Sequence, residues 1–391
     1  MLRLRDARVN GALRDLWIRD GRLTAPGPAD EEIDLAGRLV VPGFVDAHCH
    51  LDKTLWSGPW APNTAGPRLR DKIDYTRSRR ADFGVPSAPR IAELLGTMAA
   101  AGTTSVRTHT DVSPEFGLDG FHAVAEAAAA LEKVITVEQV AFPQYGLLTN
   151  PGTLELMDRA LATGLAQVVG GIDPAGVDRD PVAHLDAVFG LATAHDVPVD
   201  LHLHDPGTLG AWQFELIIDR TLRAGMEGRV TIGHGYALAE LSGIPQDELI
   251  AALAAAGIGL ATCAAHDDPV VPVLKMRDAG AGLGLGSDGI RDLWSPWGNG
   301  DLLDRAHQLA SRSGFFADED LAQALVTATT GGAELLGLTG HGLDEGATAD
   351  LVVLDAESAA EAVVTRARRL LVLKEGRTIA RDGVLTSAKR P

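Results

Sequence analysis

Val41-Pro-Gly-Phe-Val-Asp-Ala-His-Cys-His50 is an apolar, β-branched run that ends in two histidines one residue apart. On a β-strand, residues i and i+2 point to the same side, so His48 and His50 would face one point and could bind one metal ion. A single His-x-His pair is weak evidence for such a site. Four other strand-like runs of this chain also end in His or Asp, and this repetition strengthens the prediction.

Eight runs typical of β-strands alternate with helical segments from Leu39 onward. The strands are too apolar to be solvated on one face, so the pattern predicts a parallel (β/α)8 TIM barrel. A doubly wound open sheet is the alternative, but no Gly-x-Gly-x-x-Gly opens a helix after an early strand. The predicted strands are 40–48, 104–109, 134–142, 166–172, 197–204, 229–234, 258–263 and 282–288, and the predicted helices are 88–101, 120–132, 151–164, 180–195, 212–224, 247–256, 270–279 and 301–313.

The two ends of the chain depart from this alternation. They contain short strand-like runs with turn signals at Asn10-Gly11, Asp20-Gly21 and Asp382-Gly383. We expect residues 1–42 and 340–391 to form one small, discontinuous β-sandwich domain beside a barrel of residues 43–339. We expect the segment 57–80 to be a long loop after the first barrel strand, and loops of that length are often functional.

Charge and composition exclude several classes of partner. The chain has 391 residues and a formal net charge of −18, which would repel phosphate backbones and anionic lipid surfaces. Nucleic acid and membranes are therefore not expected as partners. No run approaches the roughly 20 apolar residues of a membrane span, and no leader peptide is recognisable. We expect a cytoplasmic protein, and its two cysteines cannot form a disulfide framework.

The predicted strand ends carry a set of metal-binding residue types. In a (β/α)8 barrel, the chemistry lies at the carboxyl ends of the strands. Neutral imidazoles with one carboxylate suit a borderline divalent ion such as zinc or ferrous iron. We therefore predict one divalent metal ion per chain, either zinc or ferrous iron, and we expect His109 to support its ligands through hydrogen bonds. The predicted ligands are His48, His50, His202, His234 and Asp288.

These motifs resemble those of the metal-dependent amidohydrolase superfamily, and the resemblance covers nearly the whole chain. It is carried by Phe44-Val-Asp-Ala-His-Cys-His-Leu-Asp52, His202, His234 and Gly286-Ser-Asp288. The cytosine-deaminase-like branch is similar in Ala141-Phe-Pro-Gln-Tyr-Gly146 and Asp288-Gly-Ile-Arg-Asp-Leu-Trp-Ser-Pro-Trp297. A triazine-degrading member is similar in His50-Leu-Asp-Lys53, Gly171-Ile-Asp-Pro174, His202-Leu-His204 and Ser287-Asp-Gly-Ile-Arg-Asp292.

The resemblance implies a hydrolase that acts on carbon–nitrogen bonds other than peptide bonds. Such enzymes replace an exocyclic amine on a small heterocycle, such as an aminated pyrimidine or triazine, by means of a metal-activated hydroxide. The resemblance also implies that the protein forms a homo-oligomer. Two alternatives are a cyclic amide hydrolase, which could use the same hydroxide, and a non-catalytic barrel scaffold, which need not hold a metal ion.

Departures from the cytosine-deaminase pattern shape the predicted roles. Asp205 stands where those enzymes carry Glu, and Gly289 stands where they carry a second Asp, so cytosine itself is not expected as the substrate. The stretch 170–174 contains no lysine that could bridge two metals, which implies a mononuclear centre. The predicted catalytic residues are Asp288 as proton acceptor, His204 as the favoured proton shuttle with Asp205 second, His234, and Lys53 as the cation that orients an anionic or carbonyl-rich ring. The predicted substrate-binding residues are Gln144, which offers a donor and an acceptor to a ring amide edge, Asp173, which contacts substrate or supports the shuttle, and Trp294, which forms a pocket wall.

Overall fold

Eight parallel strands form a barrel in the computed structural model, which describes residues 1–386. Their order in the sheet follows the chain from β6 to β13. A parallel bridge between Cys49 and Asp288 joins the first strand region to the last. The predicted (β/α)8 barrel is therefore confirmed. The strands are β6 Phe44–Cys49, β7 Thr103–Asp111, β8 Thr136–Phe142, β9 Val168–Ile172, β10 Val199–Leu203, β11 Val230–His234, β12 Ile258–Thr262 and β13 Leu283–Leu285.

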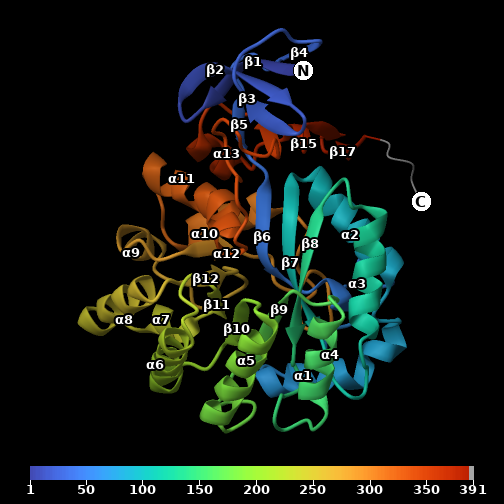
Figure 1. The fold of residues 1–391 in the computed structure, drawn as a ribbon, viewed down its shortest axis with the longest axis vertical. Coiled ribbons are helices and arrows are strands. Elements are labelled where there is room, and N and C mark those ends of the chain that lie inside the picture. The colour runs from blue at the N-terminus through green and yellow to red at the C-terminus, as the bar shows by residue number, and fades with distance from the viewer. Residues whose placement is uncertain (387–391) are drawn as a thin grey trace.

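Helices follow the barrel strands and cover the outside of the sheet (Figure 1). Helix α10, for example, contacts β6 and β13 and buries Leu302, Leu303, Ala306 and Leu309. The Asp301 carboxylate caps α10 by accepting hydrogen bonds from two N–H groups of its first turn. The helices are α2 Ala88–Ala100, α3 Asp119–Ala130, α4 Thr153–Ala162, α5 Pro181–His195, α6 Gly207–Ala224, α7 Tyr236–Glu240, α8 Ile244–Ala255, α9 Val273–Asp278, α10 Leu302–Arg312, α11 Asp318–Val326 and α12 Gly332–Leu335.

Strands from both ends of the chain form a second, mixed sheet above the barrel in Figure 1. β5 pairs antiparallel with β14, with Val40 opposite Val353, so the two ends of the chain meet in one layer. This layer has its own apolar core, which includes Leu4, Leu351 and Leu373. The prediction that strands from the two ends of the chain assemble together is confirmed. The strands are β1 Leu2–Val9, β2 Ala12–Arg19, β3 Arg22–Thr24, β4 Glu31–Asp34, β5 Leu39–Pro42, β14 Leu351–Leu354, β15 Arg369–Lys374, β16 Arg377–Arg381 and β17 Val384–Leu385, and helix α13 is Ala359–Thr365.

The prediction of one continuous strand over 40–48 is wrong. The run divides at Gly43 into β5, which belongs to the mixed sheet, and β6, which belongs to the barrel. The Gly43 N–H donates to the Asp350 carbonyl, whereas the next N–H, of Phe44, donates to the Gly102 carbonyl. A Cβ at position 43 would lie 2.3 Å from the Thr104 hydroxyl oxygen, so the crossing point requires glycine.

The prediction of a loop over 57–80 is also wrong in its second half. Helix α1 spans Leu69–Arg79, and it buries only Ile73 and Thr76. A helix that buries so little of its surface has no apolar stripe, so its periodicity could not be detected.

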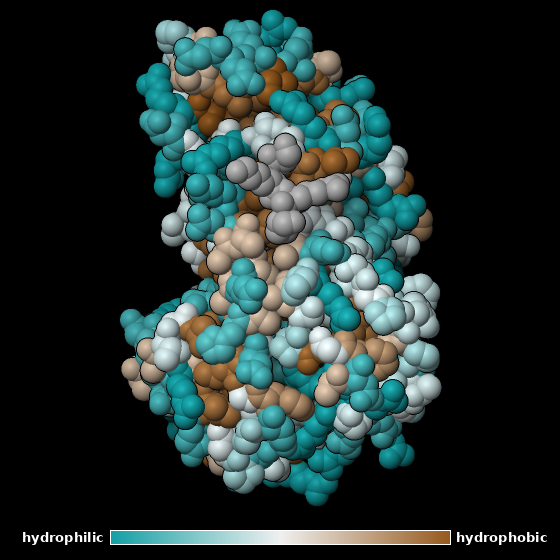
Figure 2. Space-filling view, turned by 90° about the vertical axis from the view of Figure 1, so that its right-hand side faces the viewer, coloured by the Kyte–Doolittle hydropathy of each residue, from teal (hydrophilic) through white to brown (hydrophobic). Residues whose placement is uncertain are grey.

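On the face shown in Figure 2, apolar residues form separate patches among hydrophilic ones. Within residues 1–386, no helix combines the length and apolarity that a bilayer span requires.

Candidate metal centre and active site

The ends of four barrel strands bring the five predicted metal ligands together. His50 Nε2 lies 3.3 Å from Asp288 Oδ1 and 3.3 Å from His202 Nε2. His48 Nε2 lies 3.8 Å from the same Asp288 oxygen. The ring centroids of His48 and His234 are 4.8 Å apart. Side chains that are up to 240 positions apart in sequence thus surround one point at the carboxyl end of the barrel.

This group of side chains fits a divalent cation. Burial, reinforced by neighbouring imidazoles, lowers the pKa of His48, His202 and His234 well below the usual value, so the rings are neutral and keep a free lone pair. The Nε2 atoms of His48 and His234 are buried and have no hydrogen-bond partner within residues 1–386. One ligand atom each from His48, His234 and Asp288 lies within 4.8 Å of the others. A buried histidine-rich group able to hold a metal is therefore present.

The backbone at the strand ends adopts a conformation that is rare for residues with side chains. The φ angles are 32° at Asp173, 67° at His234 and 59° at Asp288, all in the left-handed region. Each such residue costs about 1–3 kcal/mol, and strain of this kind clusters at functional sites. Glycine at position 233 leaves room for the His48 ring, because a Cβ there would lie 2.7 Å from His48 Cε1.

Asp46 links the two strands that close the barrel, and our sequence reasoning missed it. One of its oxygens accepts hydrogen bonds from the N–H groups of His48 at 3.3 Å and Ser287 at 3.0 Å. The other accepts from the Ser287 hydroxyl at 2.5 Å. Burial raises the pKa of Asp46 to about 6 despite these bonds. Its position two residues before His48 on the same strand was the signal that could have identified it.

A buried ion-pair group lies beneath the histidines. His109 Nε2 is 3.1 Å from Asp200 Oδ1, and Arg107 donates to the other Asp200 oxygen at 3.0 Å. Burial alone would raise the pKa of Asp200, but His109 and Arg107 outweigh it and lower that pKa. Ligand atoms of His48, His109 and His202 also lie within 4.8 Å of one another. Arg107 and Asp200 were missed, although each stands two residues before a strand-end histidine.

His204 is held in place by Asp173. Its Nδ1 lies 2.7 Å from one Asp173 oxygen, and its backbone N–H donates to the other at 2.6 Å. The ring centroid of His204 is 4.2 Å from that of His234, which places His204 beside the ligand group. Burial alone would lower the pKa of His204, but the Asp173 carboxylate outweighs it and raises that pKa. Asp205 instead accepts from the Gly176 N–H and the Gln213 amide, both at 2.9 Å.

Lys53 and Gln144 are buried together on another side of the ligand group. The Lys53 ammonium donates to Gln144 Oε1 and lies 3.2 Å from Asp111 Oδ1. It is also 5.3 Å from the centroid of the Phe142 ring, which stacks on His202 at 4.1 Å. Burial and then the charge of Lys53 lower the pKa of His50 to about 4, so the ammonium is close enough to act on this predicted ligand.

The network is completed by three residues that the sequence analysis did not assign to the site, namely Asp111, Tyr145 and Arg80. Asp111 accepts from the Tyr145 hydroxyl at 3.1 Å and from Arg80 at 3.4 Å. Trp294 borders the network with its ring centroid 5.6 Å from the Lys53 ammonium. The network therefore fixes the position of Lys53 from two sides.

The loop that carries Gln144 is anchored by Asp178. This buried carboxylate accepts from the N–H groups of Leu147, Leu148 and Thr149, from the Thr149 hydroxyl, and pairs with His184 Nδ1 at 2.6 Å. Burial alone would raise the pKa of Asp178, but the His184 and Thr149 hydrogen bonds outweigh it and hold that pKa well below the usual range.

Replacement of Asp178 by asparagine is expected to lower the free energy of unfolding by about 3 kcal/mol at pH 7, because it leaves a buried loop anchor incomplete. A carboxyl whose pKa is lower in the folded state stabilises above its unfolded pKa and loses this effect as the pH falls. Urea denaturation of both proteins should therefore show a constant difference from pH 7 to about pH 5 that shrinks below about pH 4. A difference that is independent of pH would contradict this account.

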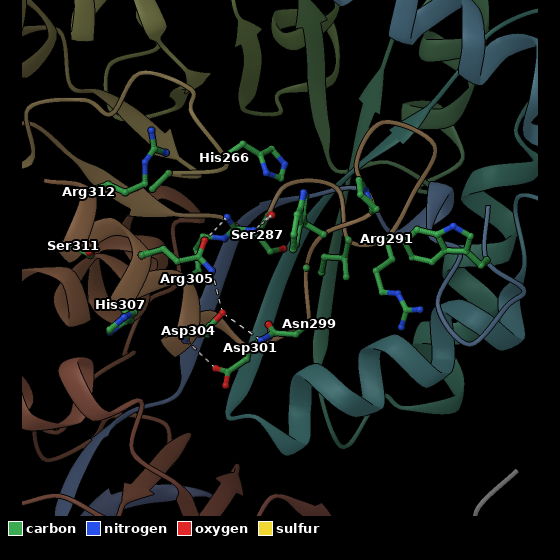
Figure 3. A pocket seen from close by; sticks show the side chains of 18 residues that line it. His266, Ser287, Arg291, Asn299, Asp301, Asp304, Arg305, His307, Ser311 and Arg312 are labelled. Carbon is green, nitrogen blue, oxygen red and sulfur yellow. Dashed lines mark hydrogen bonds between the residues drawn. The ribbon is translucent and has the colours of Figure 1, made fainter. Parts of the chain in front are cut away.

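A cavity of about 1050 Å³ lies between α10 and the loops that follow β12 and β13 (Figure 3), and Ser287 is among the residues that line it. Arg305 lines it and donates to the Ser287 carbonyl at 3.1 Å. The cavity wall is thus connected to the residue that precedes Asp288.

Comparison with known proteins identifies the family. The profile of the amidohydrolase family matches residues 31–79 and 86–380. The chain belongs to the amidohydrolase family. The predicted family and the predicted enzyme class, an amidohydrolase acting on carbon–nitrogen bonds, are therefore confirmed.

Relatives of this amidohydrolase cover nearly its whole length. It is 34% identical over 372 residues to N-isopropylammelide isopropyl amidohydrolase of Pseudomonas sp. (strain ADP), a match that covers 92% of this chain and 91% of the relative. The crystal structure of N-isopropylammelide isopropylaminohydrolase from Burkholderia multivorans is similar with a TM-score of 0.94 and 38% identity, covering 98% of this chain and 99% of the other. That of 5-methylcytosine deaminase from Klebsiella pneumoniae, liganded with phosphonocytosine, is similar with a TM-score of 0.85, 28% identity and full coverage of both chains.

Proposed function

We propose that this amidohydrolase hydrolyses the bond between a small nitrogen heterocycle and an exocyclic amine or alkylamine. The observation that carries the proposal is the convergence of four histidines and one aspartate on one buried point. The names of the relatives support the leaving group and the substrate class, because they describe the loss of an amine from such a ring. Residues 43–339 would form the catalytic unit, and residues 1–42 with 340–391 a second unit.

One divalent ion, zinc or ferrous iron, would be held by the five predicted ligands His48, His50, His202, His234 and Asp288. When bound, such an ion supplies Lewis acidity, which lowers the pKa of a coordinated water from about 16 toward 7 and polarises the carbon under attack. The His50 Nδ1 atom lies 3.1 Å from the His109 carbonyl, so an Nδ1–H donated to that oxygen would leave Nε2 free to bind.

The remaining residues would handle the proton and hold the ring. Asp288 accepts the proton of the attacking water through a carboxylate oxygen. His204 returns a proton to the departing amine from Nε2, since Asp173 occupies its Nδ1. Asp205 is the second candidate for this step, although its contacts with Gly176 and Gln213 hold it toward α6. Lys53, Gln144 and Trp294 contact the ring, and Asp173 acts through His204 because both of its oxygens already accept hydrogen bonds.

Product analysis tests the proposal directly. The zinc-loaded or iron-loaded protein is incubated with N-isopropylammelide and with a panel of aminated pyrimidines and triazines. The proposal predicts release of isopropylamine or ammonia together with a ring that has gained an oxo group. A ring-opened acid would instead identify a cyclic amide hydrolase. No product and no bound metal would identify a scaffold.

Replacement of Asp173 by asparagine is expected to lower kcat by about 10- to 100-fold with no loss of metal, because residues that orient catalytic histidines have effects of this size. Steady-state kinetics and metal analysis of the purified variant measure both quantities. The matched control is Asp158→Asn, which removes a carboxylate paired with His195 at 2.7 Å on the surface. Equal kcat values for Asp173→Asn and Asp158→Asn would contradict the positioning role.

A further inference from the structure

His234 is connected to two side chains outside the predicted ligand set. Its Nδ1 atom lies 3.2 Å from the Tyr236 hydroxyl oxygen, and this oxygen lies 2.9 Å from Asp268 Oδ2. The Nε2 atom on the other side of the His234 ring is buried and has no hydrogen-bond partner within residues 1–386. The protein therefore engages one ring nitrogen of His234 and leaves the other available to a ligand.

The Asp268 carboxylate decides the direction of both hydrogen bonds. A tyrosine hydroxyl has one proton to donate, and a carboxylate can only accept. If Tyr236 gave its proton to His234, the Tyr236 oxygen would face an Asp268 oxygen with no proton between them. The Tyr236 hydroxyl therefore donates to Asp268, and its oxygen accepts from the Nδ1–H of His234. The ring is held with its proton on Nδ1 and a lone pair on Nε2.

The backbone places both partners of His234. His234 and Gly235 have φ angles of 67° and 65°, and in this left-handed turn the Tyr236 ring lies beside the His234 ring, with the two centroids 5.4 Å apart. Asp268 lies in the loop after β12, and Arg312 of α10 donates to its backbone carbonyl. The strained conformation at His234 thus accompanies a contact that orients its ring.

We propose that Tyr236 and Asp268 are positioning residues, which form a relay that keeps the Nε2 lone pair of His234 available to a divalent ion. Hydrogen bonds of this kind fix the tautomer and the orientation of metal-binding histidines. The proposal rests on the proposed function, because the relay serves the proposed metal site. The tautomer of His234, however, can be measured without metal and without substrate.

Nuclear magnetic resonance of the metal-free protein tests the tautomer directly. Protein labelled with ¹⁵N-histidine gives long-range ¹H–¹⁵N correlations that distinguish protonated from unprotonated ring nitrogens, and a His234→Gln variant assigns the signals. The relay predicts a proton on Nδ1 of His234 in the wild-type protein. Tyr236→Phe removes the acceptor for this proton, so the Nε2–H form should increase. An Nε2–H tautomer in the wild-type protein would overturn the proposal.

Zinc affinity provides a second readout. Tyr236→Phe and Asp268→Asn should each bind zinc about 10- to 100-fold more weakly than the wild-type protein, the usual effect of removing such a partner. In Asp268→Asn the new amide can donate to the Tyr236 oxygen, so the hydroxyl can turn and donate to Nδ1, which stabilises the Nε2–H form. An aspartate-to-asparagine change beside the catalytic histidine of a serine protease acts in this way. Competition with a chromophoric chelator measures the zinc affinities.

Two controls are matched to these variants. Tyr75→Phe removes a hydroxyl that donates to the Pro62 carbonyl at 3.0 Å, outside the predicted ligand group. Asp267→Asn makes the same charge change in the same loop, on an exposed residue. Both should keep the wild-type tautomer and zinc affinity. Equal loss of affinity in Asp267→Asn and Asp268→Asn would refute the relay, because charge alone would then explain the effect.

The outcomes separate this relay from the proposed function. An Nδ1–H tautomer and relay-dependent zinc affinity, with no release of amine from any ring, would leave the relay standing and overturn the proposed function. Release of amine, with the wild-type tautomer and zinc affinity in both variants, would overturn the relay alone. A wild-type protein that binds no zinc and no ferrous iron would overturn both. If Tyr236→Phe does not fold, Asp268→Asn decides, since it keeps the phenol ring in place.

Discussion

Replacement of Asp288 by asparagine is expected to lower kcat/KM for amine release by about 10³-fold, the size of effect typical of general acid–base groups. Asparagine keeps the shape of the side chain and one oxygen, but it cannot accept a proton from water. The Asp288 carboxylate lies 3.3 Å from His50 and 3.8 Å from His48, so it is placed both to contact a cation and to receive that proton. The measurement is steady-state kinetics on the metal-loaded variant.

Metal analysis of the same sample separates the two roles of Asp288. Four predicted histidine ligands remain, so we expect most of the metal to be retained. The control is Asp186→Asn, which removes an exposed carboxylate paired with Arg220 on the surface and should leave kcat/KM unchanged. Wild-type activity in Asp288→Asn would contradict the proposed mechanism.

Replacement of His48 by asparagine is expected to reduce the metal content from about one ion per chain to less than about a tenth, with loss of turnover. His48 is fully buried, and neither of its ring nitrogens has a hydrogen-bond partner within residues 1–386. Two unpaired nitrogens in the interior are costly unless a cation uses one of them. Inductively coupled plasma mass spectrometry of protein purified without chelator measures the metal content.

His184 provides a matched control for this variant. It is equally buried, but it pairs with Asp178 away from the predicted ligands. His184→Asn should therefore lower the melting temperature while retaining about one metal ion per chain. Equal metal loss in the two variants would indicate that destabilisation, and not removal of a ligand, empties the site.

The barrel and the ligand group could be predicted because each depends on a strong local signal. Apolar, β-branched runs of strand length identify buried parallel strands, and the order of the chain alone places their carboxyl ends on one face of a barrel. The histidines and Asp288 stand at those ends, so their meeting follows from topology without knowledge of loop structure. The division of 40–48 between two sheets depends on the space beside Thr104, which no local pattern records.

The polar networks could not be predicted, because their members come from loops and from strands distant in sequence. Asp111 on β7 meets Arg80 near the end of α1 and Tyr145 in the loop after β8. Only the assembled barrel brings these groups together. The orientation of the Gln144 amide likewise depends on the contact with Lys53, 91 positions away in sequence. Residue type indicates what a side chain can donate or accept, and the fold determines which of these groups remains free.

The location of a metal ion in crystals of the metal-loaded protein tests the central claim most directly. Anomalous difference maps collected at the zinc and iron absorption edges should show one peak per chain, about 2.0–2.2 Å from histidine nitrogens of the predicted set and from the Asp288 carboxylate. No peak, or a peak between His48, His109 and His202 without contact to Asp288, would contradict the account.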